Sequence, residues 1–314
     1  MSEPTLNRIG GAVTQALDDR TFEPVIAAQT HGAEPVDVDI AFISRDVTGL
    51  STKHRVLEPL EAFYVTLRQS PKLEWVHVHS AGADRPIFGE LKTRGVRVTT
   101  SSGANAQVVA QTALAGILAL AREFPRLFDA QRAQTWTPLI GGLLPRDLPG
   151  QTAVVVGWGP IGQTLAGYLR MLGLNVIAVR SAAAQAEDGV ETYAFEDLPR
   201  IARRADWLVL ACPLSERTRG LVNARLLAAM AQHARLVNVA RGEVVVEADL
   251  IDALRANMLA GAYLDVFEHE PLDAASPLWT LPNVIVTPHS AGHSDGNEAR
   301  VDRIFLDYLR EWRR

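Results

Sequence analysis

Two hydrophobic patterns alternate along the second half of the chain. Short apolar runs rich in β-branched residues predict six strands, at Ala153–Val156, Val176–Val179, Trp207–Ala211, Leu236–Val239, Ala262–Val266 and Val284–Thr287. Between them, apolar residues recur at helical spacing, as at Ile161, Leu165, Leu169 and Leu172. Apolar strands separated by helices predict the α/β class, with a doubly wound parallel sheet that is covered by helices on both faces.

The first hundred residues show the same alternation more weakly. We expect strands at Pro24–Ala28, Val38–Ser44, Leu73–His79 and Val96–Thr100, and helices at Asn7–Leu17 and Glu58–Arg68. The stretch from Ser294 to Trp312 predicts a last helix, which could pack on either domain and which we assign to the smaller one. The expected domains are therefore a smaller one of residues 1–100 with 290–314 and a larger one of residues 101–289.

Composition narrows the possible partners. The 314 residues suffice for two domains, and 31 basic against 36 acidic side chains give a net charge of −5, so no nucleic-acid partner is expected. The single cysteine, Cys212, suits a reducing cytoplasm, and the N-terminus lacks the apolar run of a secretory signal.

The longest apolar stretch, Val108–Ala121, is shorter than the about 20 residues of a membrane span. We expect no membrane association, and a helix there that is buried in a core or, as we favour, at a subunit contact.

A glycine-rich turn follows the first strand of the larger domain. The run Gly157-Trp158-Gly159-Pro160-Ile161-Gly162 has the spacing G-x-G-x-x-G between a strand and a helix. The first glycine permits a tight turn, the second lets the backbone approach a pyrophosphate, and the third lets the helix pack on the strand. The helix start offers free N–H groups to an anion. The turn predicts dinucleotide binding, and a purely structural turn is the alternative.

The end of the next strand predicts which dinucleotide is preferred. An acid there would bind the adenosine 2′-hydroxyl, but the chain has Arg180 and Ser181, and no acid before Glu187. A guanidinium can pair with a 2′-phosphate, so we expect NADP(H) to be preferred over NAD(H). The alternative is that Arg180 stacks on adenine or faces solvent.

Three further segments end in residues able to do chemistry. They are Val237–Gly242 with Arg241, Leu264–Pro271 with Glu270, and Val286–Gly292 with His289. Ligands of open α/β sheets bind beyond the carboxyl ends of the strands, where these residues would converge. Reduction of a 2-oxo acid needs a cation for its carboxylate and a proton donor for its carbonyl oxygen, and these residue types supply both.

Together with the glycine turn, these segments resemble the D-isomer-specific 2-hydroxyacid dehydrogenase family. The resemblance runs from Leu73 to Gly292 and includes Ser80–Asp84 and Ala211–Thr218. It is closest to the glyoxylate and hydroxypyruvate reductase branch. It implies a Rossmann dinucleotide-binding domain, a smaller flavodoxin-like substrate domain and a homodimer. The implied reaction is D-stereospecific hydride transfer between NADP(H) or NAD(H) and a small 2-oxo or 2-hydroxy acid.

The resemblance also implies roles for single residues. Arg241 would bind the substrate carboxylate, His289 would move the proton, and Glu270 would fix the imidazole tautomer. Ala81, Gly82 and Ala83 would offer N–H groups to the substrate, together with Arg241 and His289. The implied cofactor-binding positions, with Asp265 near the nicotinamide carboxamide, are Gly157, Gly159, Pro160, Ile161, Gly162, Arg180, Ser181, Cys212, Pro213, Thr218, Val239, Ala240, Asp265 and Ala291.

Each catalytic candidate has a simpler alternative. Arg241 could cap a helix or form an ion pair, and Glu268 competes with Glu270 for the place beside the imidazole. His293 competes with His289, and a His-x-x-x-His pair could bind a metal, but the flanking proline and glycine disfavour a helix there, so no metal is expected. We interpret His77 and His79 as ordinary packing or polar residues.

The chain departs from the family in two places, and other functions remain open. Its first twenty residues look helical where the family begins with a strand, and Gln111 stands where relatives commonly have glutamate. Substrate choice would depend on Ser101–Asn105 and Trp136. A non-catalytic dinucleotide sensor on the same fold is the main alternative function. Formate oxidation is disfavoured by Glu270, and nothing favours phosphite oxidation.

Overall fold

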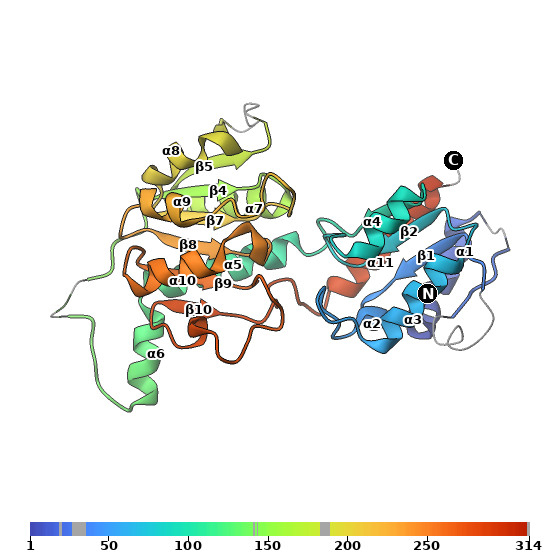
Figure 1. Cartoon of the computed structure of the whole chain (residues 1–314), viewed down its shortest axis with the longest axis horizontal. Coiled ribbons are helices and arrows are strands. Elements are labelled where there is room, and N and C mark those ends of the chain that lie inside the picture. Colours follow the sequence, from blue (N-terminus) through green and yellow to red (C-terminus); the bar gives the residue numbers. More distant parts are fainter. Residues whose placement is uncertain (19–20, 27–35, 141, 143, 183–188, 313–314) are drawn as a thin grey trace. The chain divides into compact units, whose positions relative to one another are not determined.

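The computed structural model describes residues 1–18, 21–26, 36–140, 142, 144–182 and 189–312. The chain forms two compact units, unit 1 (Met1–Asn105 with Ser294–Arg314) and unit 2 (Ala106–His293) (Figure 1). The first boundary lies after Asn105 rather than after residue 100, because Ala104 is buried in the core of unit 1. The second lies after His293 rather than after residue 289, because Ser290 and Ala291 are hydrogen-bonded to Asp265 of unit 2.

Unit 2 is built on a seven-stranded sheet in which every neighbouring pair is parallel. The strands are β4 (Thr152–Val156), β5 (Asn175–Arg180), β6 (Glu191–Ala194), β7 (Trp207–Leu210), β8 (Arg235–Asn238), β9 (Gly261–Leu264) and β10 (Val284–Val286). Their order is β10-β9-β8-β7-β4-β5-β6. Strand order reverses at β4, which lies between β5 and β7, and this confirms the doubly wound fold.

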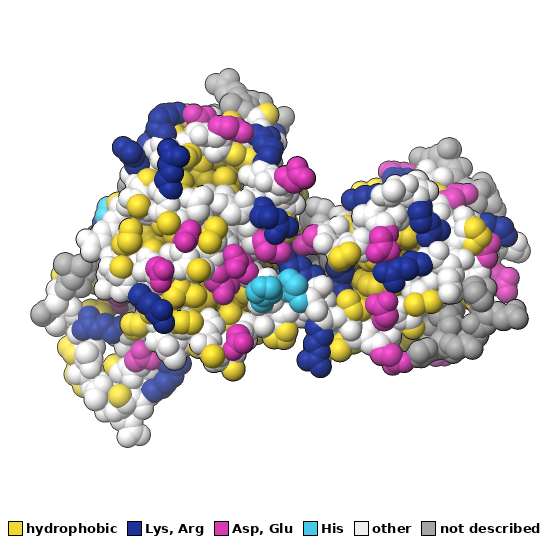
Figure 2. All heavy atoms as spheres, viewed as in Figure 1, with side chains coloured by type: hydrophobic (Ala, Val, Ile, Leu, Met, Phe, Trp, Pro, Cys, Tyr) yellow, Lys and Arg dark blue, Asp and Glu magenta, His cyan; other side chains and the backbone are white. Residues whose placement is uncertain are grey.

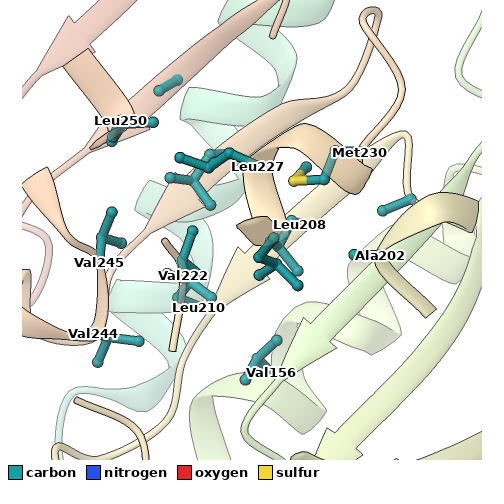
Figure 3. Close-up of a cluster of buried hydrophobic side chains, with 14 of the residues drawn as sticks. Val156, Ala202, Leu208, Leu210, Val222, Leu227, Met230, Val244, Val245 and Leu250 are labelled. Atoms are coloured by element: carbon teal, nitrogen blue, oxygen red, sulfur yellow. The ribbon is translucent and has the colours of Figure 1, made fainter. Parts of the chain in front are cut away.

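Helices cover both faces of this sheet. They are α5 (Ala106–Ala121), α6 (Phe124–Arg132), α7 (Pro160–Met171), α8 (Leu198–Ile201), α9 (Ala224–Ala229) and α10 (Glu247–Arg255), with short 3-10 turns at Phe195–Asp197, Ala202–Arg204, Gly242–Val244 and Pro277–Trp279. Successive residues of β4 face opposite cores: Val155 packs with α5 and α7, and Val156 packs with α8, α9 and α10. Figure 3 shows the second core, which includes Val156, Leu208 and Leu227.

The apolar helix expected around Val108–Ala121 is α5, and it is buried on one side only. Val109, Ala113 and Ile117 are buried in the core of unit 2. Gln107, Gln111 and Ala115 are exposed, so within a single chain the helix is not fully buried.

Unit 1 has a smaller sheet with the same layering. Its elements are α1 (Glu3–Ala16), β1 (Ile40–Ile43), α2 (Arg45–Thr48), α3 (Glu58–Gln69), β2 (Trp75–Val78), α4 (Pro86–Thr93), β3 (Arg97–Thr100) and α11 (Asn297–Trp312). The strands are parallel in the order β1-β2-β3. Helices α3 and α4 pack on one face, and α1 and α11 pack on the other.

One expected strand is not seen in the described residues, and one strand was not expected. The N-terminus forms α1, as its pattern predicts, but residues 24–26 of the expected strand Pro24–Ala28 are not in a strand, and residues 27 and 28 lie outside the described part. The carbonyl of Val25 instead accepts a hydrogen bond from the N-terminal ammonium, at 3.1 Å. Strand β6 was missed, because its sequence Glu-Thr-Tyr-Ala lacks a buried apolar run.

The described residues include no single helix with both the length and the apolar character of a membrane span; only the bent pair α5 and α6 together reaches those limits. On the face of the molecule in Figure 2, basic and acidic side chains are interspersed.

Candidate active site

The glycine turn between β4 and α7 is shaped by close packing at two of its three glycines. A Cβ on Gly157, whose φ is 105°, would lie 2.6 Å from the backbone of Ala211 and Cys212. A Cβ on Gly162 would lie 2.0 Å from the carbonyl oxygen of Gly157. Only glycine fits at either position, because the opposing atoms are backbone atoms that cannot move aside.

The second glycine opens onto free space instead. A Cβ on Gly159 would meet no heavy atom within 4 Å. Gly159 is also the N-cap of α7, it provides no side-chain cap, and Pro160 occupies the first turn. The N–H groups of Ile161 and Gly162 therefore lie at a helix start beside an open backbone, which is the arrangement that a pyrophosphate requires. These residues fit a dinucleotide.

Arg180 ends β5, and Ser181 follows it. The guanidinium of Arg217 donates to the carbonyl oxygen of Ser181 at 3.0 Å and to the Glu196 carboxylate at 2.6 Å. It also lies 5.4 Å from the ring centroid of Phe195. Arg217 thus holds the end of β5, a role that sequence reasoning missed although Arg217 lies in the segment Ala211–Thr218 that it singled out. The acid at position 187 lies outside the described residues.

The segment Cys212–Thr218 is a tightly folded loop. The Thr218 hydroxyl accepts from the Ser215 N–H at 2.7 Å and donates to the Pro213 carbonyl at 2.8 Å. Thr218 is buried and shapes the loop from within. Burial also raises the pKa of the Cys212 thiol to about 12, so this cysteine stays protonated and serves as packing.

His289 and Glu270 form a direct pair. Nδ1 of His289 lies 2.7 Å from Oε2 of Glu270, and Oε1 of the same carboxylate accepts the backbone N–H of Phe267 at 3.1 Å. The Glu270 side chain is 13% exposed and the His289 side chain 50% exposed. A carboxylate at Nδ1 fixes the proton on that nitrogen and leaves Nε2 as the atom that can exchange a proton with a ligand.

The backbone of His289 is held in an unusual conformation. Its φ is 49°, a value that residues other than glycine rarely adopt. Its N–H donates to the carbonyl oxygens of Asp265 at 2.8 Å and Thr287 at 3.0 Å. Such strain persists only where the surroundings determine the conformation. The contacts of the loop after β10 therefore fix the direction in which the His289 side chain leaves the backbone.

Asp265, at the end of β9, anchors the same loop. Its buried Oδ1 accepts from the hydroxyl of Thr287 at 2.6 Å and from the N–H groups of Ser290 at 2.8 Å and Ala291 at 3.1 Å. The carboxylate therefore holds the Thr287 side chain before His289 and the backbone N–H groups of Ser290 and Ala291 after it.

Arg241 follows β8, next to the segment that carries Glu270. A Cβ on Gly242 would lie 1.8 Å from the carbonyl carbon of Phe267, so glycine allows the two segments to touch. The backbone carbonyl of Arg241 accepts a hydrogen bond from the Asn238 side chain at 3.1 Å. Nη1 of the Arg241 guanidinium donates to the carbonyl of Ala240 at 2.7 Å. Since β8, β9 and β10 are neighbours in the sheet, Arg241, Glu270 and His289 all follow the carboxyl ends of adjacent strands.

Glu268 and His293, the alternatives to Glu270 and His289, have other hydrogen-bond partners. The Glu268 carboxylate accepts the N–H of Glu247 at 3.2 Å, and the Glu247 carboxylate accepts the N–H of Glu268 at 3.1 Å, so Glu268 caps the start of α10. His293 follows a turn in which its own N–H donates to the Ser290 carbonyl. Within the described ranges, no group of three or more metal-binding side chains is arranged around a common point.

The remaining predicted positions divide between the units. Val239 and Ala240 are buried directly after β8, and Ala291 is buried in the loop after β10. Ala81, Gly82 and Ala83 lie in unit 1, in the loop after β2, where the Ser80 hydroxyl donates to the Gly82 carbonyl at 2.6 Å.

Comparison with known proteins gives consistent matches. Residues 114–291 match the family model described as the D-isomer specific 2-hydroxyacid dehydrogenase, NAD binding domain. The chain is 31% identical over 267 residues to a glyoxylate reductase of Korarchaeum cryptofilum, which covers 82% of this chain and 77% of that protein. It is 36% identical over 232 residues to glyoxylate/hydroxypyruvate reductase B of Klebsiella pneumoniae, covering 72% of each. A D-isomer specific 2-hydroxyacid dehydrogenase from Xanthobacter autotrophicus, solved with NADPH and MES, has a TM-score of 0.60 and 36% identity over 67% of this chain and 84% of that one.

Proposed function

The chain belongs to the D-isomer specific 2-hydroxyacid dehydrogenases, a family of NAD(P)-dependent oxidoreductases, and from this premise we propose that it reduces small 2-oxo acids of the glyoxylate and hydroxypyruvate type with NADPH. The observation that carries the proposal is the His289–Glu270 pair, held at 2.7 Å beyond the ends of β9 and β10. The relatives' names supply the substrate class, and the pair supplies the means of moving the proton.

The proposed mechanism assigns one task to each side chain. Arg241 binds the substrate carboxylate and polarises the keto oxygen. His289, oriented by Glu270, donates the Nε2 proton to the keto oxygen in reduction and removes it in oxidation. The nicotinamide cofactor, when bound, supplies the hydride.

Binding and positioning are divided between the two units in this proposal. Unit 2 is the dinucleotide-binding domain, with the glycine turn and the start of α7 holding the pyrophosphate. The segments that end in Ser181, Pro213, Ala240 and Ala291 line the rest of the cofactor site. Unit 1 is the substrate domain, in which the N–H groups of residues 81–83 bind the substrate.

Steady-state assays test the proposal. We expect NADPH absorbance to fall when the purified protein is supplied with glyoxylate or hydroxypyruvate, and the product to have the D configuration in the case of glycerate. Silence across a broad panel of 2-oxo acids, with NADPH and NADH each shown to bind, would instead indicate a dinucleotide sensor.

The Arg180→Asp substitution tests the cofactor preference. A charge-assisted hydrogen bond contributes about 1.5–3 kcal/mol, so we expect the ratio of kcat/KM for NADPH to that for NADH to fall about 10- to 100-fold. Arg203→Asp, an exposed site on the same unit, is the matched control and leaves the ratio unchanged. An unchanged ratio in Arg180→Asp would show that Arg180 does not bind the 2′-phosphate.

We further propose a cytoplasmic homodimer. The support for the dimer is an exposed apolar surface on α6 and the segment after it, where Phe128, Trp136 and Ile140 are 47%, 96% and 79% exposed. A second copy of the chain is its proposed occupant, and the lone buried thiol of Cys212 suits a reducing compartment. Sedimentation equilibrium should give a dimer for the unmodified chain and a monomer for the Phe128→Ser/Ile140→Ser double variant. A monomeric parent would contradict the proposal.

A further inference from the structure

Helix α5 contacts the loop that carries His289 through a hydroxyl. The Thr112 hydroxyl lies 3.1 Å from the carbonyl oxygen of Ala291 and 3.0 Å from that of Val108, one turn earlier in its own helix. Its single proton is therefore shared between the helix and the loop. This contact fixes the carbonyl of a residue whose N–H is already bound by Asp265.

The same face of α5 supports the loop a second time, through Tyr263 of β9. Gly116 lies one turn after Thr112, and a Cβ there would lie 2.4 Å from the ring of Tyr263. The ring thus fills a slot in the helix that only glycine leaves open. Tyr263 and Gly116 are both buried.

The Tyr263 hydroxyl begins a directed series of hydrogen bonds. It lies 2.8 Å from the Thr287 hydroxyl, which donates its one proton to Oδ1 of Asp265 at 2.6 Å. Because an ionised carboxylate only accepts, Tyr263 must be the donor to Thr287. Burial raises the pKa of Tyr263 to about 12, so the phenol keeps the proton that this arrangement needs.

We propose that Thr112, Gly116 and Tyr263 are positioning residues for His289. Together they form a support that connects α5 to both ends of the loop 287–291. This support holds the His289 backbone at its positive φ and so fixes the position of the imidazole. The inference rests on the catalytic role proposed for His289 and deepens it. None of the three residues touches the substrate in this scheme. Each acts through Ala291 or Asp265.

Three substitutions remove the support one part at a time. Thr112→Val removes the hydroxyl at constant shape, Tyr263→Phe removes the other hydroxyl and keeps the ring in its slot, and Gly116→Ala displaces the ring. Since a displacement of about 1 Å at a catalytic group can cost about 100-fold in rate, we expect kcat to fall several-fold in the first two and about tenfold or more in Gly116→Ala. KM for NADPH should remain near that of the parent.

Two measurements separate positioning from damage to the fold. With deuterated NADPH, the primary isotope effect on kcat should increase in Thr112→Val and Tyr263→Phe, because a misplaced proton donor makes the chemical step more rate-limiting. A smaller folded fraction would lower kcat but would leave the isotope effect unchanged. In the cofactor-free protein, the NMR resonance of the His289 imidazole, assigned by its loss in His289→Asn, should shift in both variants. This second readout needs no activity, so it tests the support even if the proposed reaction is wrong.

Matched controls exist for each change. Thr66 of α3 also donates to a carbonyl of its own helix, and Gly167 of α7 is an exposed helical glycine with no heavy atom within 4 Å of an added Cβ. Thr66→Val and Gly167→Ala should leave kcat, the isotope effect and the His289 resonance unchanged, and Thr112→Ser should restore the parent values. If the His289 resonance and the isotope effect were unchanged in both Thr112→Val and Tyr263→Phe, the support would have no positioning role.

Discussion

Replacing His289 with asparagine is expected to lower kcat for 2-oxo acid reduction by about two to four orders of magnitude, the contribution that a positioned general acid makes. Asparagine is the suitable replacement because the residue has a φ of 49°, and asparagine adopts positive φ more readily than most side chains. The loop should therefore keep its shape, and the affinity for NADPH, measured by fluorescence titration, should remain close to that of the parent.

His233→Asn is the matched control for this substitution. His233 is also 50% exposed and also pairs with a carboxylate, Asp206, at 2.9 Å. Asp206 directly precedes β7, so this pair lies at the opposite edge of the sheet from the His289 loop. Its loss should leave kcat unchanged. Full turnover by His289→Asn would show that the imidazole does not handle the proton.

The parts of the site that follow a strand directly could be predicted from sequence. The glycine turn after β4, Arg241 after β8 and His289 after β10 each stand in a short motif next to an apolar run, and parallel strands bring such ends to one edge. The choice of Glu270 over Glu268 could not be made on spacing alone, and it rested on the family pattern. In the structure, Glu268 is bound at the start of α10 and Glu270 is bound to His289.

What the sequence could not reveal depends on contacts between distant positions. Thr112 and Ala291 are separated by 179 residues, and no periodicity predicts that one hydroxyl of α5 reaches that carbonyl. The glycine at position 116 reads as a weak point in a helix until the ring of Tyr263 is found against it. Strand β6 was missed because a half-exposed edge strand has no apolar run, and Arg217 because its partners, Ser181 and Glu196, come from other elements.

Replacing Arg241 with alanine is expected to lower kcat/KM for glyoxylate by about two to three orders of magnitude, because loss of one partner of a hydrogen-bonded charge pair costs on the order of 2–5 kcal/mol. Both KM and kcat should suffer, since the guanidinium binds the carboxylate and polarises the carbonyl. Arg241→Lys should recover only part of the activity, because an ammonium keeps the charge and loses the two-pronged geometry.

The decisive comparison uses a substrate without a carboxylate. Methylglyoxal has an adjacent carbonyl in place of the acid group, so the parent enzyme should use it poorly, and Arg241→Ala should reduce that slow activity far less than it reduces the activity with glyoxylate. The preference for glyoxylate over methylglyoxal should therefore be largely lost in Arg241→Ala. Arg255 is an exposed residue of α10, and Arg255→Ala should retain this preference. If both substrates lost activity equally, Arg241 would not act through the substrate carboxylate. Gly242 packs closely against the backbone of Phe267 and Glu268, and this contact does not involve the Arg241 side chain. The Arg241→Ala variant should therefore retain the hydrogen bond between Glu270 and His289. Added guanidinium should restore part of its activity with glyoxylate.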